Sequence, residues 1–514
     1  MTKLKTIPSV ALHRTAPGAY LTVHGQPLLL LGGELHNSSA SSLEYLEPIL
    51  DRLVALHLNT VLAPLSWELI EPEEGCYDFA LLDGMIAAAR ARGLRLVLLW
   101  FGTLKNAASS YTPAWVKTDV VRFFRAQTAP GVSGMAISVF CEEACRCDAR
   151  AFTAVMQRIR DLDAADGTVV MVQVENESGM LRAPRDLHPA AEAAFRQPVP
   201  EALTAHLAAH RAALVEEFAA IWVREGCRLT GSWTEVFGTD ADEVFMSWHM
   251  ARYLQHIAAA GRAVYDLPLF ANAWLCGGPG YVPGQYPSGG PIAKMLDVWQ
   301  LAAPAIDLLA PDIYQPDFRA HCAAYAHGPN PLYIPEALNT PVAAANVLYA
   351  IGRHQALGFS PFAIDDLTPE HPLAATYQLL TEMMPLLTAA YGTDRLTGFL
   401  QQADDEEWTA EMGEYRFLAR ACVPLIPERV PGAALLLQLD ADEFLVVGRN
   451  LTITFVPRTP ALRTAELVWL DTGTLRDGTW VPGRRLNGDE TWAGSAVLLR
   501  DELQAQRFRL HRFA

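Results

Sequence analysis

The chain has 514 residues, 51% of them hydrophobic, and its formal net charge at pH 7 is −17. This length and apolar content predict a large buried core with one further domain appended to it. The negative charge would repel phosphate backbones and anionic lipid headgroups, so we expect no nucleic acid and no membrane as partner. Small neutral ligands remain compatible with the charge, and the formation of a homo-oligomer is left open.

The N-terminal segment lacks the features of a leader. It has two lysines but no apolar run of the roughly 7–15 residues that a secretory signal needs, and no later segment approaches the roughly 20 residues of a membrane span. We therefore expect a cytoplasmic protein, whose eight cysteines stay thiols in a reducing compartment. Only Cys141, Cys145 and Cys147 cluster, and no His or Cys follows at a spacing that would complete a zinc site. We expect neither a metal nor a cofactor.

Eight short apolar runs alternate with segments of helical period between residue 20 and about residue 390. This alternation is typical of βα units around a parallel sheet. We expect strands at 28–37, 59–68, 94–102, 168–177, 267–275, 306–314, 331–338 and 360–367. A doubly wound sheet is the structural alternative, but eight strands favour an α/β fold closed into a (β/α)8 TIM barrel over residues 1–395.

The expected strands share a second pattern, because each is apolar on successive residues and turns polar at its C-terminal end. Such strands are buried on both faces, and their tips reach an open face where chemistry is placed. A Pro- and Gly-rich loop at 276–291 follows the fifth strand, and we expect it to roof this face and narrow it to a pocket.

The character of the sequence changes after about residue 395. Short segments rich in β-branched residues and bounded by Gly, Asp, Asn and Pro predict an antiparallel β-sandwich domain over residues 396–514. We interpret most of its tryptophans as core residues rather than as a ligand platform; they are Trp408, Trp469, Trp480 and Trp492.

The most informative segment is VVMVQVENESG, in which an apolar run leads into Glu175, Asn176 and Glu177 at the tip of the fourth strand. Buried carboxylates are costly unless they are paired or functional. In a regular strand Glu175 and Glu177 would point to one side and Asn176 to the other. A bend at the strand end would bring Asn176 and Glu177 into one site.

Glu336 ends the apolar run PLYIPEALN, which we assign to the seventh strand. The tips of strands four and seven face each other across a barrel of eight strands. Glycoside hydrolysis with retention needs two carboxyl groups about 5–5.5 Å apart, one to protonate the leaving oxygen and one to attack the anomeric carbon. Glu177 and Glu336 therefore predict this chemistry.

These motifs resemble those of the retaining glycosidases of the barrel superfamily, and within it most closely the family 35 β-galactosidases, whose QVENE motif stands here at 173–177. The resemblance extends to WELIEPEEGCYDF, LLWFGTLKNA and EFLVVGRNLTITF. It implies that Glu177 is the acid/base and Glu336 the nucleophile, and that Asn176 binds the 2-hydroxyl of the sugar. More weakly, it assigns to the site Glu175, Glu34, Asn106 and Tyr314.

Aromatic residues at other strand tips complete the candidate site. Trp100, Trp274 and Trp67 are placed to stack on the apolar face of a pyranose or to pack at the barrel rim, and Tyr314 to bond the nucleophile. Asp365 and Asp366 follow the eighth strand, where they would bind hydroxyls or cap a helix.

We expect hydrolysis of terminal β-D-galactose from small oligosaccharides by double displacement. Strand two reads LAPLSWE where the family has a Tyr-containing run, which leaves the sugar open: a β-glucoside or β-arabinopyranoside is the alternative. A carbohydrate-binding barrel without catalysis is a third interpretation. A metal-dependent hydrolase is disfavoured because the tips lack clustered histidines.

Overall fold

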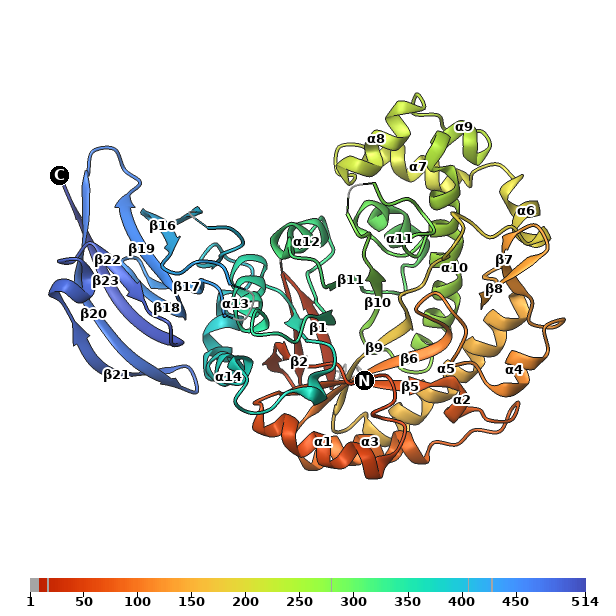
Figure 1. Ribbon diagram of the computed structural model, residues 1–514, viewed down its shortest axis with the longest axis horizontal. Coiled ribbons are helices and arrows are strands. Elements are labelled where there is room, and N and C mark those ends of the chain that lie inside the picture. The colour runs from red at the N-terminus through yellow and green to blue at the C-terminus, as the bar shows by residue number, and fades with distance from the viewer. Residues whose placement is uncertain (1–8, 16–17, 279, 405, 427–428) are drawn as a thin grey trace, which may run out of the picture.

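The computed structural model describes residues 9–15, 18–278, 280–404, 406–426 and 429–514. The first eight residues, on which the expectation of a missing leader partly rests, lie outside these ranges. A helix-rich part with a parallel sheet lies to the right in Figure 1, and the C-terminal strands, drawn in blue, lie to the left. None of the described helices is both long and apolar enough to cross a membrane.

Six parallel strands form the central sheet in the order β12, β11, β10, β9, β6, β5. Every side chain of β5, β9 and β11 is buried, which explains why these segments are apolar on successive residues. In chain order the strands are β5 (Thr60–Ser66), β6 (Arg95–Lys105), β9 (Val169–Asn176), β10 (Leu269–Trp274), β11 (Leu308–Ile313) and β12 (Glu336–Ala337).

Two shorter strands, β4 (Leu30–Leu31) and β13 (Gly358–Phe359), pair in parallel with each other. Single parallel bridges join them to both edges of the central sheet: Glu34 bridges to Leu62 of β5, and Phe359 bridges to Ile334 before β12. The six-stranded sheet is therefore curled, and the separate pair of β4 and β13 is bridged to it.

Seven of the eight expected strands overlap a parallel strand of the structure, but those at 28–37 and 331–338 are reduced to two residues each, β4 and β12. The expected run at 360–367 begins after β13 has ended at Phe359, and its residues Ile364–Asp366 form a 3-10 helix, η3. Close packing at the first strand requires glycine, because a Cβ on Gly33 would lie 2.2 Å from the Ile364 side chain.

Helices cover the outside of the curled sheet (Figure 1). The longer ones are α1 (Leu43–Ala55), α3 (Ala80–Ala91), α5 (Glu142–Asp163), α10 (Ala241–Arg262), α13 (Ala343–His354) and α14 (Pro372–Ala390). The shorter ones are α2 (Trp67–Ile70), α4 (Ala114–Thr118), α6 (Pro189–Phe195), α7 (Glu201–His210), α8 (Glu216–Arg224), α9 (Trp233–Phe237), α11 (Leu296–Ala302) and α12 (Phe318–Tyr325).

Two small antiparallel additions were not expected from the sequence. The first joins β1 (Val10–Arg14), β2 (Ala19–Val23) and β3 (Gln26–Leu28), and the Arg14 guanidinium donates to the Pro329 carbonyl at 2.9 Å. The second is a hairpin of β7 (Arg125–Ala129) and β8 (Val132–Ile137), inserted between β6 and α5.

The C-terminal strands form two antiparallel sheets that share one buried apolar cluster, which includes Phe399, Phe417, Phe444 and Phe508. The larger sheet has the order β14 (Leu396–Leu400), β17 (Ala433–Asp440), β18 (Glu443–Arg449), β23 (Gln504–Phe513), β20 (Thr464–Arg476), β21 (Thr479–Leu486). The smaller has the order β15 (Glu407–Met412), β16 (Tyr415–Ala421), β19 (Leu451–Pro457), β22 (Ala496–Leu499).

Strand β17 is buried on both of its faces. Ala433, Leu435 and Leu437 belong to the large core that also contains α13 and α14, whereas Ala434 and Leu436 belong to the core between the two C-terminal sheets. Helix α13 and strand β17 are in direct contact. The C-terminal sheet therefore also serves as a wall of the core beneath the parallel sheet.

The four C-terminal tryptophans have different environments. Trp408 and Trp480 pack against the cores while partly buried, as interpreted from the sequence. The Arg485 guanidinium lies over the Trp469 ring, 5.5 Å from the centre of that ring. Trp492 is 54% exposed. Trp492 is therefore a surface residue, whereas Trp469 is half-buried.

Candidate active site

The backbone bends sharply at the tip of β9. Glu175 and Glu177 both have φ in the left-handed region, at +61° and +44°. Such values break the alternation of a regular strand. As a result, Glu175 points away from the open face, while Asn176 and Glu177 share one site.

Glu175 does not line the open face, so its assignment to substrate binding is wrong. Its carboxylate accepts bonds from the backbone N–H groups of Thr103, at 3.1 Å, and Leu104, at 2.5 Å. Burial, and then the charge of the neighbouring Asp148 on α5, raise the pKa of Glu175. Its side chain fixes the end of β6 against β9.

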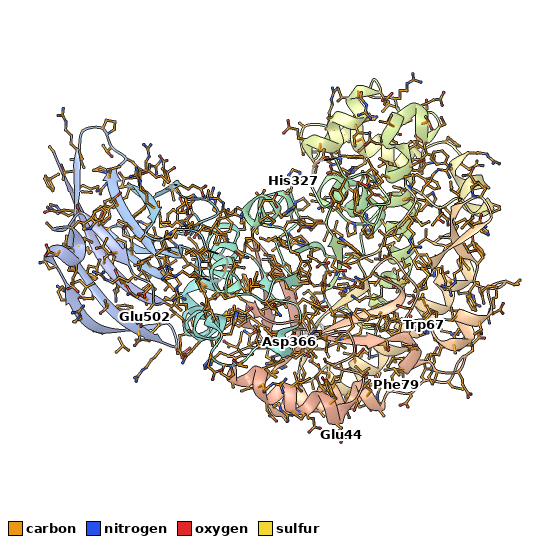
Figure 2. The ribbon with its side chains drawn as sticks, in the orientation of Figure 1. Glu44, Trp67, Phe79, His327, Asp366 and Glu502 are labelled. Atoms are coloured by element: carbon orange, nitrogen blue, oxygen red, sulfur yellow. The ribbon has the colours of Figure 1, made fainter. Side chains whose placement is uncertain are left out.

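Trp100 is also misassigned as a sugar-stacking residue. It is fully buried between β6 and α5, where its ring packs on Phe152 and its Nε1 donates to Asp148 at 2.8 Å. Trp67, labelled in Figure 2, is likewise fully buried and donates to Glu71 at 2.8 Å. Both indoles have structural surroundings, because each is fully buried and donates to a buried carboxylate.

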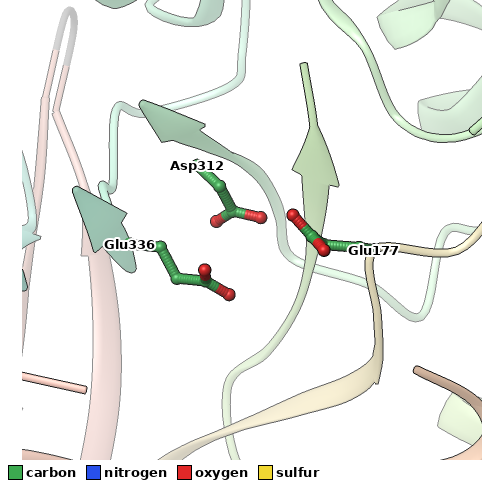
Figure 3. A group of neighbouring side chains, drawn as sticks. All are labelled: Glu177, Asp312 and Glu336. Carbon is green, nitrogen blue, oxygen red and sulfur yellow. The ribbon is translucent and has the colours of Figure 1, made fainter. Parts of the chain in front are cut away.

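Three carboxyl groups converge at the open face, on the tips of β9, β11 and β12. Glu177, Asp312 and Glu336 each place one oxygen within 4.8 Å of the others (Figure 3). Glu177 is 6% exposed, Glu336 5% and Asp312 1%. Acidic side chains this close and this buried need strong local compensation.

Glu336 is held by hydrogen-bond donors from three neighbouring strand tips. Its Oε1 accepts from Asn176 at 3.3 Å and from Asn272 at 3.2 Å, and its Oε2 accepts from the Tyr314 hydroxyl at 2.8 Å. These bonds fix the direction of the carboxylate and stabilise its negative charge. The expected contact of Tyr314 with Glu336 is therefore present.

Glu177 lies in a different electrostatic environment. Burial, and then the negative charge of Glu336, raise the pKa of Glu177 to about 8, against the opposing effect of Lys105. The Asn106 amide donates to the Glu177 carboxyl, and the Glu177 backbone N–H donates to Asn272 at 2.9 Å. The protonated form is thus favoured for Glu177, whereas three hydrogen-bond donors stabilise the negative charge of Glu336.

Sequence reasoning missed Lys105, Asn272 and, as a member of the site, Asp312. Lys105 is buried and donates to the Asn176 Oδ1 at 3.0 Å. Asn272 bonds Asp312 at 2.8 Å as well as Glu336. The available signal was weak: each is a single polar residue at a strand tip, the same pattern that identified Glu336.

Trp274 and the first and last strands frame this centre. Trp274 ends β10 and is 39% exposed, so its role in stacking stays a prediction. His36 Nδ1 contacts Asp365 at 3.0 Å, and the Ser39 hydroxyl donates to the same carboxylate at 2.6 Å. Asp365 therefore links the loop after β4 to the loop after β13 by hydrogen bonds, instead of capping a helix.

Glu34 faces the same centre from the bridge between β4 and β5. It is fully buried, and neither of its carboxyl oxygens has a partner among the described residues. Burial, and then the charge of Glu336, raise its pKa well above the ordinary value. An unpaired buried carboxyl group of this kind costs stability and persists where a ligand uses it.

Replacing Glu34 with Gln should raise the unfolding midpoint at neutral pH, by the equivalent of about 1–2 kcal/mol. The unfolded carboxyl group loses its proton from about pH 4.3, whereas the folded pKa is higher, so wild-type stability falls as pH rises between the two. The gain of the variant should therefore grow above about pH 4.3 and vanish below it. Thermal unfolding across pH tests this. The exposed Glu73→Gln variant is the control. A Glu34→Gln variant that is less stable than wild type at pH 8 would contradict this prediction.

The three converging carboxyl groups lie close enough to ligate one cation, and hard cations such as Mg²⁺ and Ca²⁺ prefer oxygen ligands. Burial raises the pKa of Glu177 and Asp312 above the ordinary range, which favours their protonated forms. Burial also raises the pKa of Cys141, Cys145 and Cys147, and these thiols form no potential metal group within the described part of the chain.

Two family models match parts of the chain. Residues 40–218 match Glyco_hydro_42, described as beta-galactosidase, and residues 373–497 match a domain of unknown function, DUF5597. The first match contains Glu177, Lys105 and Asn106 but ends before the strand of Glu336. No match was found among curated proteins.

Similar solved structures include β-galactosidases from Rahnella sp. R3 and Marinomonas ef1, each 15% identical, and a GH42 β-galactosidase from G. stearothermophilus, 14% identical. Each has a TM-score of 0.47 and matches 70% of this chain. The chain matches 57%, 60% and 57% of their respective lengths.

The matched model belongs to family 42 and corrects the resemblance to family 35. The Asn–Glu pair on strand four and the Glu on strand seven, on which the earlier resemblance rested, did not distinguish family 35 from family 42. Both family assignments indicate a β-galactosidase-like glycoside hydrolase domain. Residues 40–218 form a β-galactosidase-like glycoside hydrolase domain.

Proposed function

We propose that this protein is a retaining exo-β-galactosidase in which Glu177 is the general acid/base and Glu336 the nucleophile. The observation that carries the proposal is the approach of the two carboxyl groups to within 4.8 Å at facing strand tips, where retention needs a short separation. Their unequal surroundings support the division of roles: burial favours the protonated form of Glu177, and three donors stabilise charge on Glu336.

We infer further that the curled sheet is a closed (β/α)8 barrel formed by residues 1–395, with residues 396–514 as a β-sandwich domain. The bridges from Glu34 to Leu62 and from Ile334 to Phe359, together with the pairing of β4 with β13, support closure. Closure would set the tips of β9 and β12 across one mouth.

In the first chemical step, a Glu336 carboxylate oxygen forms a bond to the anomeric carbon while the bond from that carbon to the glycosidic oxygen breaks. Glu177 transfers its proton to the departing oxygen, so the aglycone leaves as an alcohol. The product is a glycosyl ester on Glu336 and a Glu177 carboxylate. Because the ester carries no charge, Glu177 then loses the repulsion that raised its pKa.

In the second step Glu177 takes a proton from water as the water oxygen attacks the anomeric carbon. The ester bond breaks, Glu336 regains its charge, and two inversions give retention. Asn176, held by Lys105 at 3.0 Å, is placed to bond the 2-hydroxyl, an interaction that strengthens as positive charge develops on the ring. Glu34 supplies free oxygens for a further hydroxyl of the glycone.

The low exposure of both catalytic groups supports action at chain ends. With Glu177 and Glu336 only 6% and 5% exposed, the mouth suits a terminal sugar better than the middle of a polymer. The description of the matched model as beta-galactosidase supports galactose as glycone. A β-glucoside or β-arabinopyranoside processed by the same residues, or a binding barrel without turnover, would be revealed by the experiment below.

The proposal is tested by comparing nitrophenyl β-glycosides as substrates and by trapping the enzyme with 2-deoxy-2-fluoro-β-D-galactosyl fluoride. We expect the β-galactoside to give the highest kcat/KM and the label to appear on the peptide that contains Glu336. A label on another residue would overturn the nucleophile assignment. Turnover of the glucoside with the label still on Glu336 would change only the sugar.

A further inference from the structure

A separate cavity of about 290 Å³ lies beside the acid/base residue. Three segments line it: the turn Asn106–Ala108 after β6, the hairpin of β7 and β8, and residues Met180–Arg182, which follow Glu177 closely in the chain. Such a volume accommodates one ring-sized group.

The walls of this cavity are tied together by hydrogen bonds. The buried Asp186 accepts from the Gln127 backbone N–H at 2.9 Å and from the Ser138 hydroxyl at 2.6 Å, which joins the hairpin to the segment after Glu177. The Ile137 backbone N–H donates to the Ser109 hydroxyl at 2.8 Å, which joins the hairpin to the turn after β6. These hydrogen bonds fix the positions of the three segments that line the cavity.

The position of the cavity relates it to the leaving group. Asn106 both lines it and donates a hydrogen bond to the Glu177 carboxyl. In the proposed reaction Glu177 protonates the glycosidic oxygen, so the aglycone must lie on the Glu177 side of the sugar. The cavity occupies that side, and the glycone lies toward Glu336.

The lining indicates which aglycone fits. Its buried floor is apolar, with Ala126, Ala136 and Met180 at 4%, 6% and 4% exposure, and its mouth carries the exposed side chains of Val132 and Met135. Aromatic rings and carboxylates most often hold a sugar, the rings by stacking and the carboxylates by hydrogen bonds. Neither group is present among the residues that line this cavity. Its polar members are hydroxyl groups, the Asn106 amide and the exposed Arg182.

We propose that this cavity is the aglycone subsite and that it selects an apolar, ring-sized leaving group over a second sugar. The inference rests on the proposed function, because the side on which an aglycone lies follows from the role of Glu177. The β7–β8 hairpin is then the element of this chain that determines aglycone specificity.

The test compares benzyl β-D-galactoside with lactose, since both release an aliphatic alcohol and differ mainly in the polarity of the aglycone. We expect the wild-type kcat/KM to be higher for the benzyl substrate. Met135→Glu and Val132→Glu, made separately at the exposed mouth, should each lower kcat/KM for the benzyl substrate by about 5- to 20-fold and change lactose less than about twofold. Val121→Glu, 88% exposed and outside the cavity, is the matched control.

The outcomes separate this inference from the proposed function. Hydrolysis of both substrates with no preference, or equal losses on both in the Met135 and Val132 variants, would overturn the aglycone subsite and leave the catalytic assignment standing. Failure to hydrolyse either galactoside, together with absence of a fluorosugar label on Glu336, would overturn the proposed function and the subsite with it.

Discussion

Replacing Glu336 with Gly should lower kcat for every β-galactoside by about 10⁴- to 10⁶-fold, the range expected when a covalent nucleophile is removed. Asn176, Asn272 and Tyr314 would remain to bind the sugar, so substrate binding should be much less affected than turnover. Steady-state kinetics with nitrophenyl β-galactoside measure the loss. The exposed Glu73→Gly change controls for a general effect of losing a carboxylate.

Added azide makes this result specific for the nucleophile. In the cavity left by Glu336→Gly, azide should attack the anomeric carbon directly and yield the α-galactosyl azide, since a single displacement inverts the configuration. NMR of the product identifies the anomer. A β-galactosyl azide, or wild-type turnover without azide, would show that another residue is the nucleophile.

Replacing Glu177 with Ala should give a loss that depends on the leaving group. For substrates with basic leaving groups such as lactose, kcat/KM should fall by about 10²- to 10⁴-fold, because these need a proton as they depart. For a dinitrophenyl galactoside the first step should be nearly unaffected, and the glycosyl-enzyme should accumulate as a burst. Azide should now give the β-galactosyl azide, through attack on the Glu336 ester.

The pH profile gives an independent readout of Glu177. Because its pKa is raised to about 8 and the acid form is active, wild-type kcat/KM should decline on the alkaline side near that pH. The decline should disappear in Glu177→Ala when the dinitrophenyl substrate is used. A profile unchanged by the substitution would assign the alkaline limb to another group and contradict Glu177 as the acid.

The parallel sheet was the most predictable part of the molecule. Strands covered on both faces must be apolar on successive residues, and polar residues can follow only where the strand leaves the core. This rule located the tips that carry Glu177 and Glu336, 159 positions apart in the chain, at one face. It holds because burial, not local propensity, shapes these segments.

Side-chain direction at the tips was not predictable by the same rule. Trp100 and Glu175 were placed in the site by position, but the pairing of β6 with β9 shifts register after Trp100, and Glu175 adopts a left-handed φ. Both turn toward α5 instead. Such shifts are set by tertiary contacts, here with Asp148, and leave no signal in the local sequence.

The β7–β8 hairpin escaped prediction for a different reason. Its segment RAQTAPGVSGMAI has few large apolar residues, and Val132 and Met135 are exposed, so it lacks the alternating pattern of a half-buried strand. Its stability comes from distant partners, chiefly Asp186 and Ser109. The element that we assign to aglycone choice is thus invisible to pattern analysis.

Because β17 is buried on both faces, the C-terminal strands cannot be removed without exposing part of the core of the remaining protein. Ala433, Leu435 and Leu437 complete the apolar layer over α13, the helix that follows Glu336 in the chain. A truncated protein ending before β14 would present this layer to water, and loosening of α13 would reach the nucleophile. The C-terminal strands therefore support the core that carries Glu336, and we expect the chain to require expression as a whole.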